Sequence, residues 1–242
     1  MNVLLIKKAM SPVIAVSLIG LLLAVGCATD RDSGGATATQ RTPSRFRSPD
    51  GRSVEIGRSY PADGGMSYKD PHLDKCWVAE GFSFSGYDTL YIAPTLSTAS
   101  FQPDEARPLE IARSNFPLEL QRDLQSSGLF RDVVCDEAQI KPGAHTLRLE
   151  NTIIQYSKGG GGARYFVGMY GGGQPLLRVQ GVMKDGDKKV FTYEGKRSGV
   201  SGGSRAFGAF MKDEDIQSED IRSLCLDLTD FVSAVAGKYS PR

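Results

Sequence analysis

The sequence predicts an α+β domain, with a mostly antiparallel sheet of about five strands and two helices packed on one face, preceded by a signal peptide and a disordered tether. Three observations support this fold class. Residues 145–156 alternate apolar and polar side chains, an Asp185-Gly186 step separates two further strand-like runs, and residues 214–238 place apolar side chains at steps of three and four. Alternation is typical of a strand with one wet face, Asp-Gly of a hairpin, and the longer period of an amphipathic helix.

The elements follow in chain order. Residues 89–93 form a short apolar run closed by Pro94, which favours a buried strand. Residues 107–127 carry apolar side chains on one helical face and end at Gly128, a common helix stop. Strands are expected at residues 130–135, 145–156, 176–183 and 188–196, and a last helix at 214–238. Because that helix has a clear apolar face, we expect it to dock on the open face of the sheet.

Pro117 interrupts the pattern of the first helix. Proline lacks a backbone N–H and crowds the preceding turn. The helix therefore either kinks at Pro117 or restarts there, with Asn115 or Phe116 as the cap.

The first 26 residues have the features of an export signal. Lys7 and Lys8 precede an apolar run of thirteen residues that ends in Leu23-Ala24-Val25-Gly26-Cys27. This run is shorter than the ~20 residues of a membrane-spanning helix. Its end resembles a bacterial lipobox, which implies cleavage before Cys27 and acylation of that residue. Ala28 follows the cysteine instead of an inner-membrane retention Asp, so the resemblance implies the outer membrane, facing the periplasm.

Residues 27–75 are expected to be the lipidated cysteine and a flexible tether, leaving residues 76–242 as a single periplasmic domain. From residue 28 to 75 only Phe46, Val54, Ile56 and Leu73 are Leu, Ile, Val or Phe. So little apolar area does not offset the entropy of ordering a chain. Alternatively, the arginines of this segment grip anionic lipid or cell-wall polymer, although seven acids nearly cancel its eight bases.

The composition excludes several function classes. The whole chain has 29 Lys and Arg against 28 Asp and Glu, so no charge excess favours nucleic acid. The string Gly199–Gly203 fits a serine-nucleophile elbow, but that elbow needs a later His, and both His72 and His145 come earlier. The glycine run 159–162 lacks the Gly-Lys-Ser/Thr of a phosphate-binding loop. We therefore expect no catalytic residues and no cofactor.

The cluster Asp70, His72, Asp74 and Cys76 has the residue types of a metal site. It lacks a second cluster at ligand spacing, and Pro71 indicates a turn. We interpret the cluster as a polar loop and expect no metal.

Three cysteines remain once Cys27 is acylated. In an oxidising compartment, one disulfide and one buried thiol is the economical arrangement. Cys225 follows Leu224 on the apolar face of the last helix and is expected to be buried, which leaves Cys76 and Cys135 as the predicted disulfide.

Eight of the fifteen residues from 159 to 173 are Gly, with aromatic side chains between them. Such a segment either binds a partner or folds over its own core. As partner-binding residues we name Arg164, Tyr165, Phe166 and Tyr170.

Three segments, residues 87–94, 124–133 and 161–179, resemble a family of bacterial envelope lipoproteins known as domain of unknown function 4410. The resemblance covers residues 86–203. This family is similar in architecture to the small α/β domain of TolB amino-terminal and CsgG-type envelope proteins. The resemblance implies a helix after the first strand and another closing the fold, and it implies no catalytic residues.

Together these features predict a non-enzymatic accessory lipoprotein of the cell envelope. Its partners would be the membrane, through acyl chains on Cys27, and another envelope protein or a second copy of itself. The alternative is a module that binds a ligand or cell-wall polymer, which would need Tyr165, Tyr170 and Tyr193 to line a pocket.

Overall fold

A computed structural model describes residues 43–159, 175–198 and 213–241 of the protein. The described helices are α1 (Ala106–Ser126), α3 (Asp213–Val235) and the short 3-10 turns η1 (Phe84–Gly86), η2 (Pro103–Glu105) and η3 (Glu137–Gln139). The strands are β1 (Ser44–Arg47), β2 (Ser53–Ile56), β3 (Arg58–Ala62), β4 (Gly65–Lys69), β5 (Lys75–Ala79), β6 (Thr89–Ile92), β7 (Leu96–Ser97), β8 (Asp132–Val134), β9 (Thr146–Ser157), β10 (Leu176–Asp185), β11 (Lys188–Arg197) and β12 (Ser240–Pro241).

The main sheet has nine strands, eight of them in the order β3-β4-β5-β11-β10-β9-β6-β8, with β7 paired to β9. Neighbours from β3 to β9 are antiparallel, whereas β6 runs parallel to both β9 and β8. The predicted α+β class is confirmed. The sheet is mixed, with antiparallel pairs from β3 to β9 and parallel pairs at β6, β7 and β8, and it has more strands than the five predicted. A second sheet of three strands has the order β12-β1-β2.

The parallel pairing follows from the helix between β6 and β8. Two parallel neighbours need a long crossover connection, and α1 supplies it. Helix α1 is continuous across Pro117, so the predicted restart does not occur.

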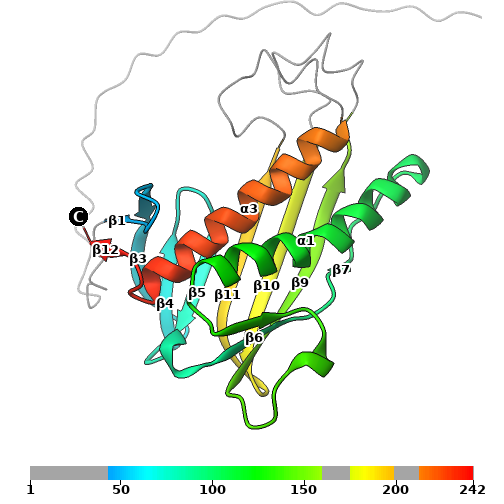
Figure 1. The fold of residues 1–242 in the computed structure, drawn as a ribbon. Helices are drawn as coiled ribbons and strands as arrows, with labels where there is room; N and C mark the ends of the chain where they lie inside the picture. Colours follow the sequence, from blue (N-terminus) through cyan, green and yellow to red (C-terminus); the bar gives the residue numbers. More distant parts are fainter. Residues whose placement is uncertain (1–42, 160–174, 199–212, 242) are drawn as a thin grey trace, which may run out of the picture. The chain divides into compact units, whose positions relative to one another are not determined.

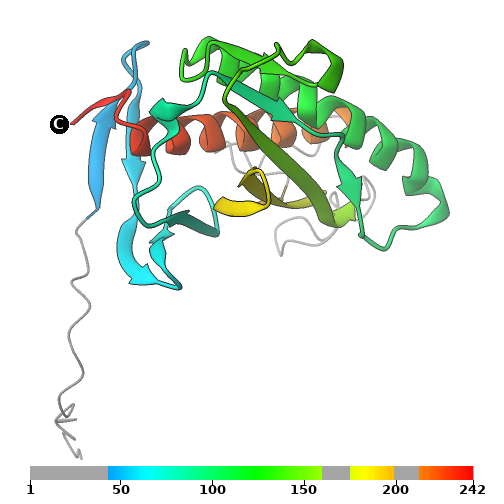
Figure 2. The same cartoon turned by 90° about the horizontal axis from the view of Figure 1, so that it is seen from below.

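Both helices lie on the same face of the sheet, as predicted (Figures 1 and 2). They pack on each other and enclose one large core with the inward side chains of the strands. The largest fully buried side chains are aromatic and come from all parts of the domain: Phe84, Phe116, Phe130, Phe191 and Phe231. Inward and outward residues of β9 alternate in exposure, which confirms the one-sided strand predicted for residues 145–156.

The prediction of a flexible tether up to residue 75 is wrong for residues 43–75. This segment forms β1 to β4 and the start of β5. Its few apolar side chains are used efficiently, because Val54, Ile56 and Leu73 are all buried in the main core. Strand pairing with β5 and contacts with α3 supply the rest of the stabilisation.

The predicted disulfide between Cys76 and Cys135 is also wrong, since both are free thiols, as is Cys225. Cys76 lies on β5, and Cys135 directly follows β8. Five strand spacings of about 4.8 Å each separate these strands, whereas a disulfide joins Cα atoms only ~5.5 Å apart. Cys225 is buried, as expected, and burial raises the pKa of its thiol.

Neither α1 nor α3 is apolar enough along its length to cross a membrane, and no other described helix is long enough.

Candidate functional site

Most of the residues that the sequence nominated lie outside the described residues. These are the lipidation residue Cys27, the expected contact residues Arg164, Tyr165, Phe166 and Tyr170, and the serine string 199–203. Their predicted roles stay predictions.

The polar cluster at residues 70–76 forms a turn. The Asp70 carboxylate accepts hydrogen bonds from the backbone N–H groups of His72 (2.9 Å) and Leu73 (3.0 Å). Cys76 points into the core, with its thiol pKa raised by burial. In the part of the chain that the structure describes, no three His, Cys, Asp or Glu side chains gather closely enough to hold a metal ion.

Tyr193, which the alternative function needed at a pocket wall, lies in the interior of the domain. It is buried on β11, under the helices, and its hydroxyl donates to Asn151 Oδ1 at 2.7 Å. Burial raises the pKa of this hydroxyl well above its usual value.

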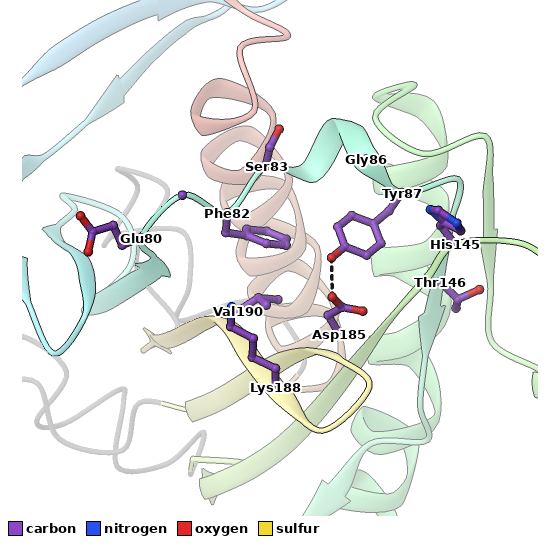
Figure 3. Close-up of a pocket in the computed structure, with 11 residues that line it drawn as sticks. Glu80, Phe82, Ser83, Gly86, Tyr87, His145, Thr146, Asp185, Lys188 and Val190 are labelled. Atoms are coloured by element: carbon purple, nitrogen blue, oxygen red, sulfur yellow. Dashed lines mark hydrogen bonds between the residues drawn. The ribbon is translucent and has the colours of Figure 1, made fainter.

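A cavity of about 610 Å³ instead lies at one end of the sheet (Figure 3). Three segments line it: the β5–β6 loop with η1, the β10–β11 hairpin, and the residues at the start of β9. Its lining combines aromatic, charged and hydroxyl side chains, namely Glu80, Phe82, Ser83, Tyr87, His145, Thr146, Asp185 and Lys188, together with Gly81, Gly86 and Val190.

A hydrogen bond links two of the segments that line this cavity. The Tyr87 hydroxyl donates to Asp185 Oδ2 at 2.8 Å, joining the β5–β6 loop to the hairpin. Burial and this carboxylate raise the pKa of Tyr87, so its hydroxyl stays protonated and acts as a donor. Phe82 packs against both Phe84 and Tyr87, which holds the aromatic wall in place. Donors, acceptors and an aromatic wall suit the binding of a small polar molecule.

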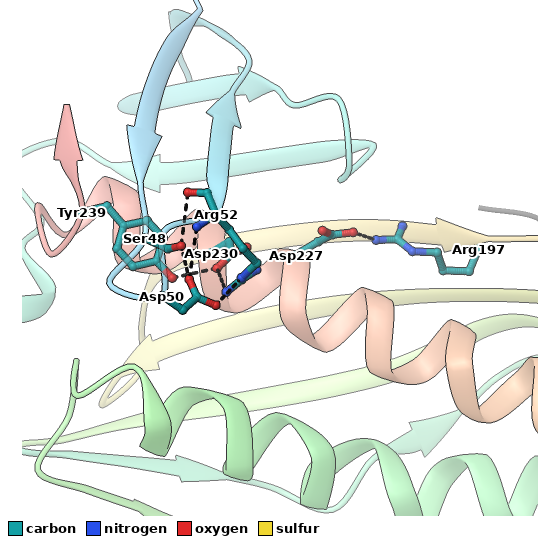
Figure 4. A network of polar contacts seen from close by, with 7 residues as sticks. All are labelled: Ser48, Asp50, Arg52, Arg197, Asp227, Asp230 and Tyr239. Atoms are coloured by element: carbon teal, nitrogen blue, oxygen red, sulfur yellow. Dashed lines mark hydrogen bonds and ion pairs between the residues drawn. The ribbon is translucent and has the colours of Figure 1, made fainter. Parts of the chain in front are cut away.

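A second polar site joins the hairpin formed by β1 and β2 to α3 (Figure 4). The Arg52 guanidinium donates to both oxygens of Asp230, at 2.6 and 3.1 Å, and its Nε donates to Asp50 at 2.6 Å. The Tyr239 hydroxyl also donates to Asp230, at 2.7 Å. Bidentate pairing of this kind fixes geometry as well as charge. The site therefore locks β1, β2 and the carboxyl terminus onto the end of α3.

The carboxylates of this site differ in their surroundings. Hydrogen bonds from Ser48 and Arg52 lower the pKa of Asp50 to about 2. One helical turn along α3, burial raises the pKa of Asp227, an effect opposed by its ion pair with Arg197. Arg197 is itself buried and also donates to the His72 carbonyl at 2.9 Å. These contacts fasten the 70–76 turn to α3, so the network is a structural joint between the amino-terminal strands and the helix.

No protein-family model matches the chain, and no curated protein is similar to it in sequence. Membership of the domain of unknown function 4410 family therefore stays a prediction from the three motifs. Solved structures show a distant likeness. The PelC dodecamer from Paraburkholderia phytofirmans is 13% identical, covers 63% of this chain and 96% of that one, and gives a TM-score of 0.40.

A protein from Xanthomonas campestris, of the family known as domain of unknown function 330, is 10% identical, with 66% of this chain and 91% of that one covered and a TM-score of 0.38. The chain is thus distantly similar in structure to PelC and to this second bacterial protein.

Proposed function

We propose that the chain is a lipid-anchored, non-enzymatic accessory protein of the cell envelope, held at the periplasmic side of the outer membrane, that acts by binding another envelope protein or a second copy of itself. The observation that carries this proposal is the sequence Leu23–Cys27 at the end of a short apolar run. Two or three acyl chains hold a protein on a membrane far longer than one. Such an anchor would present the folded domain, which includes the described residues from 43 onward.

Exposed apolar side chains support a role in protein binding. Ile111 and Leu118 on α1 are 44% and 56% exposed. They are seven residues apart and so lie on one side of the helix, away from the buried side that carries Phe116. Exposed apolar side chains that share one face suit contact with another protein. The aromatic residues of segment 159–173 would add to such a surface.

The anchor is tested by replacing the acylated residue. Cys27→Ser should move the protein from the membrane fraction to the soluble periplasmic fraction, because serine at position 27 offers no thiol for acylation. Fractionation and immunoblotting measure the change, and Cys135→Ser is the matched control that should stay on the membrane. Membrane retention of Cys27→Ser at the level of the control after a high-salt wash, which removes charge-based contacts, would contradict the lipid anchor.

Partner binding is tested by crosslinking in intact cells, followed by identification of the attached protein. The triple substitution Tyr165→Ser, Phe166→Ser and Tyr170→Ser should remove the crosslinked species, because it deletes the proposed aromatic contacts. A matched control, Tyr60→Ser with Phe101→Ser, removes two exposed aromatic side chains elsewhere. Unchanged crosslinks in the triple variant would remove segment 159–173 from the binding surface.

The second candidate function is a module that binds a ligand or cell-wall polymer. The cavity beside Tyr87 and Asp185 is the observation that favours it, because its aromatic wall and polar groups suit a sugar. If this function is correct, soluble cell-wall fragments should bind the chain and lose affinity in Phe82→Ala, but not in Phe101→Ala. Absence of binding to the unmodified chain would reject it.

A further inference from the structure

The two faces of the main sheet differ sharply in charge. The face opposite the helices is formed by alternate residues of β3, β4, β5, β11, β10 and β9. On these strands it carries eight bases and two acids: Arg58, Lys69, Lys75, Lys189, Lys196, Arg178, Lys184 and Arg148 against Glu194 and Glu150. We call this surface the basic face. The sequence of α3, on the other side, has seven acids and one base. The balanced total charge therefore conceals a separation of charge between two sides of the domain.

Each of the two acids on the basic face forms ion pairs with two cations. Glu194 pairs with Lys75, at 3.4 Å, and with Arg178. Glu150 pairs with Lys184 and Arg148, at 2.7 and 2.9 Å. The group around Glu194 keeps a net charge of +1, whereas the group around Glu150 is balanced because Arg148 also lies 4.0 Å from Glu137. Among the described residues, the ion pairs therefore leave the charges of Arg58, Lys69, Lys189 and Lys196 uncompensated.

One row of the basic face brings like charges together. Arg58 on β3 lies opposite Lys69 on β4. Lys75 on β5 follows in the same row, because Tyr68 pairs with Cys76 one position away. Like charges directly opposite each other destabilise a sheet. In residues 43–159, 175–198 and 213–241, neither Arg58 nor Lys69 has an ion-pair partner, so an anion from outside the domain would relieve this repulsion.

Aromatic side chains adjoin the row. A groove of about 440 Å³ is lined by Tyr60, Trp77 and Lys189, along with Lys69 and Lys75, and by the acids Asp63 and Asp74. Lys189 Nζ lies 5.0 Å from the centre of the Trp77 ring, whose Nε1 donates to the Ala62 carbonyl. Tyr60 is 42% exposed. Tyr and Trp beside Lys are the side chains that prefer the headgroup region of a membrane.

The position of the chain entry favours a membrane as the occupant. Strand β1 pairs with β2, and β2 leads through Gly57 directly into β3, the edge strand that carries Arg58. Fifteen residues lie between Cys27 and Pro43, so the sixteen steps of the chain reach at most ~58 Å in any conformation. A lipid on Cys27 would hold this edge of the sheet close to the bilayer, where the effective concentration of lipid phosphates is high.

We propose that the basic face binds the phosphate headgroups of an anionic lipid surface, with the row Arg58, Lys69 and Lys75 at its centre. The acyl anchor and the basic face would then be two signals that hold the domain against the membrane. In that orientation the acidic α3 and the exposed side chains of α1 point away from the lipid. This proposal rests on the proposed function for the reach of the anchor, but the binding itself needs no acyl chain.

Vesicle binding tests the proposal without the anchor. The chain without residues 1–26 and with Cys27→Ser is mixed with vesicles of phosphatidylcholine alone or containing about one third phosphatidylglycerol. It should sediment with the anionic vesicles only, and added salt should release it. The triple variant carries Arg58→Gln, Lys69→Gln and Lys75→Gln. Its partition coefficient onto the anionic vesicles should fall on the order of 100-fold, because each cation contributes a factor of about five.

The control removes the same three charges elsewhere. Arg107→Gln, Arg222→Gln and Lys238→Gln change exposed side chains of α1, α3 and the segment after it, and should keep most of the vesicle binding. All six positions are exposed, and equal urea midpoints would verify folding. Equal losses in the two variants, or no binding by the parent, would overturn the proposal.

Alginate, a soluble polyuronate, serves as the third probe. Binding to alginate but not to vesicles, lost in the variant of the basic row, would overturn the membrane proposal in favour of an acidic polymer. Since the protein used here lacks acyl chains, these outcomes are independent of whether Cys27→Ser releases the protein in cells. Failure of the basic face and failure of the lipid anchor are therefore distinguishable.

Discussion

Replacing Phe231 by alanine is expected to lower the free energy of unfolding by ~3–5 kcal/mol. Phe231 is 1% exposed and packs α3 against the sheet at β4 and β11. Its ring stacks on Phe191 of β11 with a centroid distance of 6.0 Å and meets Tyr68 of β4 edge-on at 5.2 Å. Alanine would remove both ring contacts and leave a cavity that the surrounding strands cannot fill.

Urea unfolding measures this loss as a lower midpoint at unchanged slope. The matched control is Phe101→Ala, because Phe101 is 50% exposed and its loss should change stability by less than ~0.5 kcal/mol. A comparable loss in both variants would show that α3 does not seal the core through Phe231.

The long elements could be predicted because each carries its own periodic signal. Leu224, Leu228 and Phe231 recur on one face of α3, and all three are buried. The alternation of β9 and the Asp185-Gly186 hairpin gave three neighbouring strands. The patterns of α3 and β9 extend over ten or more residues, enough for the period to exceed chance, whereas the hairpin depends on one Asp-Gly step.

Strands β1 to β4 could not be predicted in the same way. They are four or five residues long, contain few apolar side chains, and include Pro61 and Gly65, with further glycines between them. Their stability comes from distant partners, such as Asp230, which binds Arg52 across 178 positions of sequence. No local pattern records such a contact, and the composition of the segment therefore favoured a tether.

The candidate sites also differ in how far a local sequence pattern predicts them. The cavity joins Tyr87 to Asp185 across 98 positions, so its formation depends on the topology. Only part of the basic face has a local signal: Arg148, Arg178 and Lys196 stand at outward positions of strands that the sequence does predict. The central row of Arg58, Lys69 and Lys75 lies on β3, β4 and the start of β5, in the segment that the composition assigned to a tether, so the whole face emerges only from the fold.

The second large effect is expected from a single methyl group. Gly181→Ala on β10 should destabilise the domain by ~2–5 kcal/mol, combining overpacking with damage to a buried hydrogen bond. A Cβ at Gly181 would lie 2.1 Å from Tyr193 Cε1 and 2.8 Å from Asn151 Oδ1. Those two residues are 2% and 1% exposed and joined by a 2.7 Å hydrogen bond, so the Tyr193 ring has no free space to enter.

The sign of the change makes the test informative, because Gly to Ala at an unhindered position usually stabilises by about 0.4–1 kcal/mol. Gly86→Ala is such a position, since its Cβ would meet nothing within 4 Å. Urea unfolding should therefore shift in opposite directions for the two variants. In a Tyr193→Leu background the cost of Gly181→Ala should shrink, because the ring that causes the clash is gone. An unchanged cost there would mean that Tyr193 is not what makes glycine necessary at this position of the strand.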